Sequence, residues 1–308
     1  MKAIESFVSR LTVGEPQVAE KLAVFPLFLA GQVAMDYLLL DEALQAEQAH
    51  VTEVSEGGHV PELAFENASP RRVLLVDGDE LVGARQNRIV NITILVGAGK
   101  KLVIPVSCVE QGRWSYRSRK FEAAERSLFA SLKARKMAAV SRSLREDGMR
   151  ESDQGEVWDG IRAKMSSFEV SSDTAAMGDL YAGVQGKLDD YEKAFAAVDG
   201  QVGAVFATGS RVIGLEVFDA PEAFAKTFRK MVRAYAMDAQ GEAQPVDKAA
   251  TLADVRQFLE AMTKAATESY AALGEGEDVR LEGENLAGGA LVDGERVVHL
   301  AAYRLEEG

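Results

Sequence analysis

The distribution of proline and glycine divides this 308-residue chain into two parts with different local structure. Five of the seven prolines lie before residue 106, where short runs of β-forming residues alternate with turn formers such as Asp77-Gly78. Residues 118–145 contain neither proline nor glycine and are rich in Ala, Lys, Arg, Glu and Leu, a composition that predicts one long helix. We therefore expect a β-rich part followed by a helix-rich part.

The runs between the turn signals are predicted strands, at residues 50–54, 62–66, 72–76, 89–96 and 102–109. Beyond the long helix, further helices are predicted at residues 156–168, 175–198, 221–239 and 251–273. Pro221 in a first helical turn and a capping box from Thr251 to Asp254 mark the starts of the last two helices. A strand pair is predicted at residues 201–218, and Asp293-Gly294 predicts a C-terminal hairpin.

These elements predict an α+β fold, because strands occur both before and after the helices. The N-terminal antiparallel β-rich part, sandwich-like or a curled sheet, is expected at residues 1–117. The helix-rich part with additional strands is expected at residues 118–308. No linker rich in Gly and Ser separates the two parts, so we expect them to pack as one body.

Composition predicts a soluble, cytoplasmic protein. The net charge is −13, which disfavours binding of nucleic acid or an anionic membrane over the whole surface. Cys108 is the single cysteine, so no internal disulfide can form. The N-terminus does not resemble a signal peptide, and Pro26, Gly31 and Asp36 interrupt the most apolar window, residues 22–40, so no membrane span is expected.

The isolated histidines and the single cysteine give only weak evidence for a metal site or a nucleophile. The histidines His50, His59 and His299 are too far apart, with no cysteine spacing, to predict a metal site. His59 follows Gly57-Gly58 and fits a turn better than a site loop. Cys108 fits an inert core thiol better than a nucleophile, because no histidine is near it in sequence. The cofactor, if there is one, is unknown.

The candidate site lies where the strand at residues 89–96 becomes polar. Side chains alternate between faces along a strand, so Val90, Ile92, Ile94 and Val96 share a core face. A hairpin through residues 97–101 would pair Val90 with Cys108 and then Arg88 with Glu110. An alternative register with a three-residue loop places Gln86 opposite Glu110. Both registers bring the two polar clusters together at one end of the hairpin.

This convergence predicts a polar site, with Glu110 as candidate catalytic residue. The candidate ligand-binding residues are Arg85, Gln86, Asn87, Arg88, Asn91, Gln111 and Arg113. A catalytic site would use Glu110 as general acid or base, with Arg85 or Arg88 clamping an anion. A binding site would use the arginines against phosphate or carboxylate. A structural ion pair that closes the sheet and an interface with a partner protein remain open alternatives.

A basic segment follows the site. Residues 113–150 carry eleven Lys and Arg residues against four Asp and Glu residues, a net charge of about +7. Such a segment could hold nucleic acid through Arg135, Lys136 and Arg142. A helix that is solvated or docked on its own acidic body is favoured, so nucleic acid is not the expected partner.

Residues 60–114 resemble a known family. The run VPELAFENASPRRVLLVDGDELVGARQNRIVNITILV, followed by IPVSCVEQGRW, resembles the ARG and rhodanese-phosphatase-superfamily-associated protein domain family, with GARQNR and SCVEQGRW as the specific words. PLFL near Pro26 and VGAVFATGSRVIGLEVF near Val202 are similar too. The resemblance implies a prokaryotic protein associated with conflict or immunity systems. It carries over no reaction, cofactor or catalytic residue.

Three functions follow from these patterns. The first is a ligand-binding or accessory module whose polar pocket takes a small polar or anionic ligand. The second is a hydrolase or transferase that acts on a phosphorylated or sugar-like small molecule through Glu110 with Arg85 or Arg88. The third is a scaffold that binds a partner protein. An open concavity with unpaired Gln86 or Asn87 would favour the first two, and a closed network would favour the third.

Overall fold

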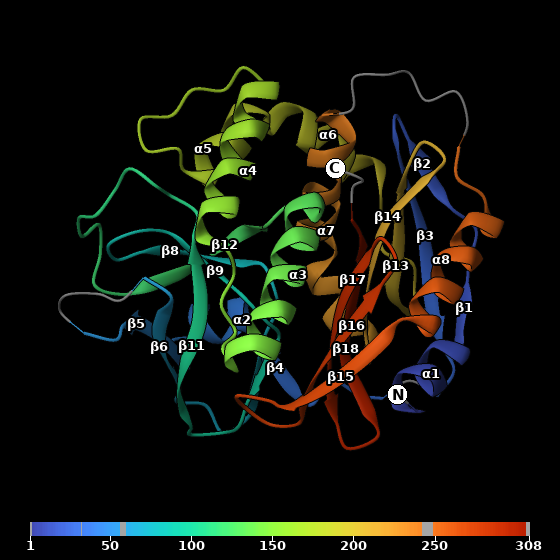
Figure 1. Cartoon of the computed structure of the whole chain (residues 1–308), viewed down its shortest axis with the longest axis horizontal. Coiled ribbons are helices and arrows are strands. Elements are labelled where there is room, and N and C mark those ends of the chain that lie inside the picture. Colours follow the sequence, from blue (N-terminus) through green and yellow to red (C-terminus); the bar gives the residue numbers. More distant parts are fainter. Residues whose placement is uncertain (1, 32, 56–59, 242–248, 306–308) are drawn as a thin grey trace.

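The chain forms an α+β fold built around one large sheet and two smaller ones (Figure 1). A computed structural model describes residues 2–31, 33–55, 60–241 and 249–305. The helices of these residues are α1 (Lys2–Ser9), α2 (Leu40–Gln45), α3 (Ala130–Asp147), α4 (Gln154–Ser167), α5 (Met177–Gly183), α6 (Gln185–Ala194), α7 (Pro221–Gly241) and α8 (Leu252–Lys264). The predicted fold class is confirmed, with an N-terminal β-rich part followed by helices and further strands.

The large sheet is antiparallel and joins the first strands of the chain to the last. Its nine strands, in spatial order, are β1 (Leu11–Val13), β3 (Leu22–Leu29), β13 (Gln201–Thr208), β14 (Arg211–Phe218), β18 (Arg296–Arg304), β17 (Leu286–Asp293), β16 (Glu277–Gly283) and β15 (Ala266–Ala271), with β2 (Gln17–Ala19) paired to β3. Because β3 pairs with β13, the two predicted parts share one sheet. A domain boundary at residue 117 stays a prediction.

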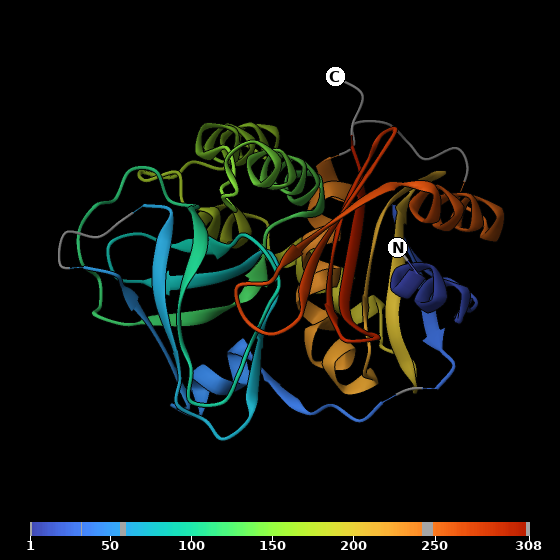
Figure 2. The ribbon, with the colours of Figure 1, turned by 60° about the horizontal axis from the view of Figure 1, so that its bottom comes forward.

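Helices cover both faces of the large sheet (Figure 2). Phe25 of β3 packs in one core with Phe258 of α8, and α1 lies on the same face. Val24, the neighbour of Phe25 along β3, packs in the other core with Tyr235 of α7. The run LAVFPLFL is therefore almost continuously apolar, since a strand buried on both faces has no side for polar residues.

The two smaller sheets form the β-rich part. One has three strands, β10 (Ile94–Val96), β7 (Arg72–Leu75) and β4 (Tyr37–Leu39). The other has six strands, β12 (Phe121–Ser127), β8 (Asp79–Gly83), β9 (Arg88–Val90), β11 (Lys101–Cys108), β6 (Glu62–Asn67) and β5 (Ala49–Glu53). Helix α3 joins the two regions, because Leu132 and Met137 lie in the core beside the large sheet while Val140 and Leu144 lie in the core of the smaller sheets.

Several local predictions are confirmed. β13 and β14 pair through the turn at Gly209-Ser210, and α7 begins at Pro221. The Thr251 hydroxyl accepts a hydrogen bond from the Asp254 N–H, which caps α8 as the sequence predicts. Asp293 pairs with Arg296 at the turn between β17 and β18, where Gly294 has φ +64°.

Other predictions are wrong in segments with helical composition. Residues 118–145 do not form one helix, because residues 121–127 pair with β8 as β12 and bury Phe121 opposite Gly83. The helix predicted to residue 273 ends at Lys264, because β15 pairs with β16. The predicted helix at residues 175–198 is two helices, α5 and α6, which meet at Val184. In the first two cases strand pairing overrides composition.

Candidate functional site

The pairing of β9 with β11 sets the geometry of the predicted site. Val90 lies opposite Val106, and Arg88 lies opposite Cys108. The alternative register is therefore the correct one, and the preferred pairing of Arg88 with Glu110 is wrong. The predicted strand at residues 89–96 breaks after Val90, and its second half pairs with β7 in another sheet. The expected hairpin through residues 97–101 does not form, since the first half of β11 pairs with β6 instead.

Glu110 is the centre of a closed hydrogen-bond network. Arg113 Nη2 donates to Glu110 Oε2 over 2.7 Å, and the Asn87 N–H donates to the same oxygen over 3.2 Å. The Thr174 hydroxyl donates to Oε1. Burial alone would raise the pKa of Glu110, but these hydrogen bonds, led by that of Arg113, hold it below its ordinary value. The side chain is buried and its carboxylate is ionised at neutral pH.

Gln86 and Asn87 are fully engaged in the same network. Gln86 Nε2 donates to the Glu110 carbonyl over 2.8 Å, which joins the two polar clusters as the alternative register predicts. The Gln86 Oε1 atom accepts from Arg88 Nη1 and from the Cys108 thiol. Asn87 Oδ1 accepts from Arg113. No unpaired amide therefore points into open space at these two positions, and this end of the sheet has the closed network expected of a scaffold rather than an open pocket.

Arg88 is the exception in this network. Its side chain is 0% exposed, and its Nε and Nη2 atoms have no hydrogen-bond partner among the described residues. Arg88 also makes no ion pair with a described carboxylate, and burial lowers the pKa of its guanidinium. Cys108 beside it is fully buried, and burial raises the pKa of that thiol to about 11, so the inert thiol form dominates.

Asn91 and Gln111 lie outside this network. The Asn91 amide donates to the Arg150 carbonyl and accepts from the Ser107 hydroxyl. The Gln111 side chain is exposed and accepts from Arg162 of α4. The structure thus brings together five of the eight candidates and places the side chains of Asn91 and Gln111 on separate contacts. The five are Gln86, Asn87, Arg88, Glu110 and Arg113.

Arg85 lies beside a cavity of about 590 Å³. Thr52 and Glu53 of β5 line the cavity, and β5 lies on the opposite side of the molecule from α1 and α8 (Figure 1). Its lining residues are Thr52, Glu53, Ser55, Arg85, Tyr116 and Arg119. Among the described lining residues, two arginines against one carboxylate give an excess of positive charge in a chain whose net charge is −13. Glu53 Oε1 accepts from the Arg85 N–H, while the buried Oε2 atom has no partner among the described residues.

Arg88 is linked to this cavity through aromatic rings. The Arg85 guanidinium lies 4.5 Å from the ring centroid of Tyr116 and 5.5 Å from that of Trp114. The Arg88 guanidinium lies 5.7 Å from the same Trp114 ring. These distances are typical of cation–π contacts. Arg88 is therefore linked through Trp114 to Arg85, which lines the cavity, and Trp114 and Tyr116 remain 45% and 50% exposed.

A set of ion pairs around the turn at Asp77-Gly78 was not predicted from the sequence. Four cations pair with acids of the sheets: Lys136 with Asp77 (2.8 Å), Lys230 with Asp79 (2.9 Å), Arg126 with Glu80, and Lys133 with Glu216 (2.9 Å). A Cβ atom at Gly78 would meet the Lys133 side chain at 2.5 Å, so glycine is required there. The spacing of Lys133 and Lys136 within the apolar stripe of Leu132, Met137 and Val140 was the available signal.

These pairs also show where the basic segment lies. Lys133 and Lys136 are buried against the acidic strands, and Arg145 and Arg150 pair with Glu268 and Asp278. The segment is docked on its own body, which was the favoured alternative. The described residues contain no group of three or more His, Cys, Asp or Glu side chains that could hold a metal ion. His59 lies outside the described residues.

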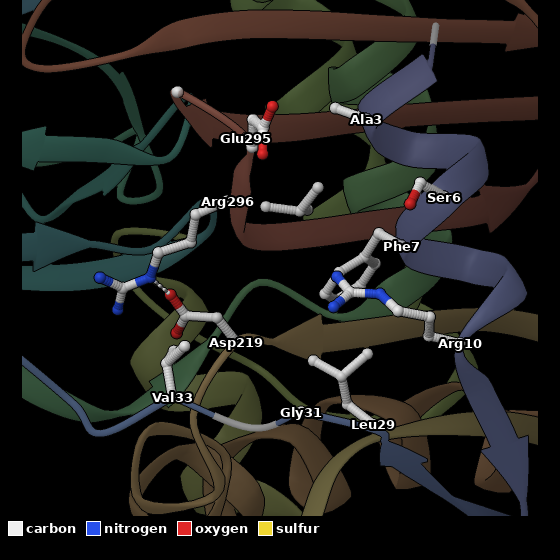
Figure 3. A pocket seen from close by; sticks show the side chains of 12 residues that line it. Ala3, Ser6, Phe7, Arg10, Leu29, Gly31, Val33, Asp219, Glu295 and Arg296 are labelled. Carbon is white, nitrogen blue, oxygen red and sulfur yellow. Dashed lines mark hydrogen bonds and ion pairs between the residues drawn. The ribbon is translucent and has the colours of Figure 1, made fainter.

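A second cavity, of about 710 Å³, lies between α1 and the turn that joins β17 to β18 (Figure 3). Its apolar wall includes Phe7 and Leu29. Arg296 is bonded to Asp219 and Asp36, and the lining residues comprise two basic and two acidic side chains. This cavity therefore lacks the charge excess of the first.

Comparisons with known proteins place the chain in a family. Among the described residues, no helix combines the length and apolarity that a membrane crossing requires. No curated protein and no solved structure is significantly similar to the chain. The model of one protein family matches residues 10–303, nearly the whole sequence. The chain thus belongs to the ARG and Rhodanese-Phosphatase-superfamily-associated Protein domain family.

Proposed function

We propose that this protein is a ligand-binding accessory module, and that its site is the cavity lined by Arg85, Arg119, Tyr116 and Glu53. The ligand is a small phosphorylated molecule. The observation that carries this proposal is the excess of positive charge among the described lining residues, with Arg85 and Arg119 on the wall. Arg88, which shares the Trp114 ring with Arg85, is buried and makes no ion pair with a described carboxylate. A more specific role, as an accessory protein of a prokaryotic conflict system, rests on the family resemblance alone.

The positive charge of the buried Arg88 guanidinium favours an anion nearby. A buried guanidinium with unmade hydrogen bonds is costly, because each unsatisfied polar group loses its hydration without compensation. An anion in the adjacent cavity lowers that cost through the local field. Phosphate suits arginine in particular, because the planar guanidinium donates two parallel hydrogen bonds to it. The cavity volume of about 590 Å³ lies in the usual range for small-molecule sites.

Glu110 has a positioning role in this proposal. Its two carboxylate oxygens already accept from Arg113, Asn87 and Thr174, and its lowered pKa leaves it without a proton to donate at neutral pH. The network fixes the backbone that carries Arg85 and Arg88. A catalytic role for Glu110 therefore has less support than a binding role for the arginines.

A thermal-shift titration tests the proposal. Inorganic phosphate and ribose 5-phosphate should raise the melting temperature of the wild type, since a ligand that binds only the folded state adds RT ln(1 + [L]/Kd) to its stability. Arg85→Ala and Arg119→Ala should remove most of the shift. Arg256→Ala, on the exposed face of α8, is the matched control and should retain it. A shift that is absent, or that survives in Arg85→Ala, would contradict the proposal.

A further inference from the structure

The cavity beside Arg85 carries three different recognition groups, and together they define the class of ligand. We infer that the ligand is a single nucleotide, with its phosphate on Arg85 and Arg119, a ribose hydroxyl on Glu53, and its base on Tyr116. This inference rests on the proposed phosphate-binding function and extends it to the sugar and the base.

Glu53 is the group that a simple anion does not explain. Its Oε2 atom is buried without a hydrogen-bond partner among the described residues, while Oε1 accepts from the Arg85 N–H over a long 3.3 Å. The Glu53 carboxylate attracts the buried Arg88 guanidinium, and its remaining acceptor capacity suits a ligand that donates a hydrogen bond as well as carrying a phosphate. The hydroxyls of ribose are such donors, and Thr52 and Ser55 line the cavity beside Glu53 with further hydroxyl groups.

Tyr116 provides a platform for a planar group. Its ring lines the cavity, one side lies against the Arg85 guanidinium at 4.5 Å, and the residue is still 50% exposed. Stacking of a base on an aromatic side chain contributes about 1–3 kcal/mol. Arg85 is also held by Trp114, so the guanidinium is ordered before the ligand arrives. Ordering a binding group in advance lowers the entropic cost of binding.

The surroundings favour one nucleotide over a polymer. The basic side chains Lys133 and Lys136 of α3, which could have continued a basic track, are buried in ion pairs with Glu216 and Asp77. The net charge of −13 repels a long polyanion. A cavity of about 590 Å³ is of a size for one small molecule.

Calorimetric titration of four probes separates the three contacts: inorganic phosphate, ribose 5-phosphate, adenosine monophosphate and 2′,3′-dideoxyadenosine monophosphate. Adenosine monophosphate should bind about tenfold or more tightly than ribose 5-phosphate, and Tyr116→Ala should abolish that difference. The dideoxy probe should bind about tenfold more weakly than adenosine monophosphate, and Glu53→Gln should bring the two together. Arg256→Ala should reproduce the wild-type series.

Tryptophan fluorescence gives an independent readout at the site. In a Trp158→Phe background Trp114 is the sole tryptophan, 5.5 Å from the Arg85 guanidinium, and adenosine monophosphate should change its emission. If ribose 5-phosphate and adenosine monophosphate bind equally, and Tyr116→Ala changes neither, the nucleotide inference fails while the phosphate site stands. If neither binds, both fail. An oligoadenylate that binds more tightly than the mononucleotide would overturn the single-nucleotide assignment.

Discussion

Replacement of Arg88 by methionine should leave the ligand-free protein as stable as the wild type, or slightly more stable. Arg88 is fully buried, yet its one hydrogen bond among the described residues runs from Nη1 to Gln86 Oε1 at 3.3 Å. Its Nε and Nη2 atoms have no partner in that part of the chain. Methionine has a similar length and no polar hydrogen atoms, so it fills the space without this deficit.

The expected change in the free energy of unfolding follows from the cost of the unmade hydrogen bonds of Arg88 and from the interactions that methionine cannot make. Two unsatisfied buried groups cost about 2–6 kcal/mol in the wild type, at about 1–3 kcal/mol each. The substitution loses one charge-assisted hydrogen bond, about 1.5–3 kcal/mol, and the interaction with Trp114, about 0.5–2 kcal/mol. Taken at their lower and at their upper ends, the gain and the losses nearly cancel, so the net change in the free energy of unfolding should lie between about zero and 1 kcal/mol of stabilisation. Phosphate binding should weaken, because the field behind the cavity is removed.

Urea unfolding at pH 7 measures this change, and Arg113→Met is the matched control. Arg113 is bonded to Glu110 Oε2, to Asn87 Oδ1 and to the Ala84 carbonyl. Its replacement leaves the buried Glu110 carboxylate without its cation and should cost about 3–5 kcal/mol. If Arg88→Met is also destabilised, by about 3 kcal/mol or more, Arg88 is a structural residue, and the reasoning from its unmade hydrogen bonds is refuted.

Three further predictions follow from buried or capping groups. Lys136→Met should destabilise the protein by about 3–5 kcal/mol in urea unfolding, because Asp77 is left buried without its partner, and adding Asp77→Asn should recover part of the loss. Burial lowers the pKa of His299 to about 3. As the pH falls below about 6.5, the unfolded state therefore binds a proton at this histidine while the folded state does not, and the free energy of unfolding decreases. Between pH 7 and pH 5 this free energy should decrease by roughly 2 kcal/mol more in the wild type than in His299→Gln. Thr251→Ala should cost about 1 kcal/mol through loss of the cap of α8, with Thr251→Ser close to wild type in thermal unfolding.

Local signals predicted those elements that a turn, a capping residue or a proline marks in the sequence. Asp293-Gly294 marked the last hairpin, and the capping residue Thr251 and Pro221 marked two helix starts, because each depends on backbone geometry within a few residues. Residues 121–127 have the composition of a helix, and only the distant strand β8 makes them a strand. Pairing over such separations leaves no trace in a short window.

The hydrogen-bond network around Glu110 was predictable in part, because alternation along a strand is also a local property. Alternation along β9 and β11 brings Gln86 to Glu110, as the alternative register predicted. The break after Val90 was not foreseen, because the run at residues 89–96 stays apolar across two sheets. Nor could the chain alone show that Arg88 lacks a carboxylate partner among the described residues, since Glu53 and Glu110 were both available to it and neither pairs with it.

A crystal structure of the protein with adenosine monophosphate tests the proposed nucleotide site most directly. We expect phosphate oxygens within hydrogen-bond distance of the Arg85 and Arg119 guanidinium groups, with a ribose hydroxyl on Glu53 and the base against Tyr116. Nucleotide density in the cavity beside Arg296, or an empty cavity beside Arg85 at saturating nucleotide, would contradict the assignment.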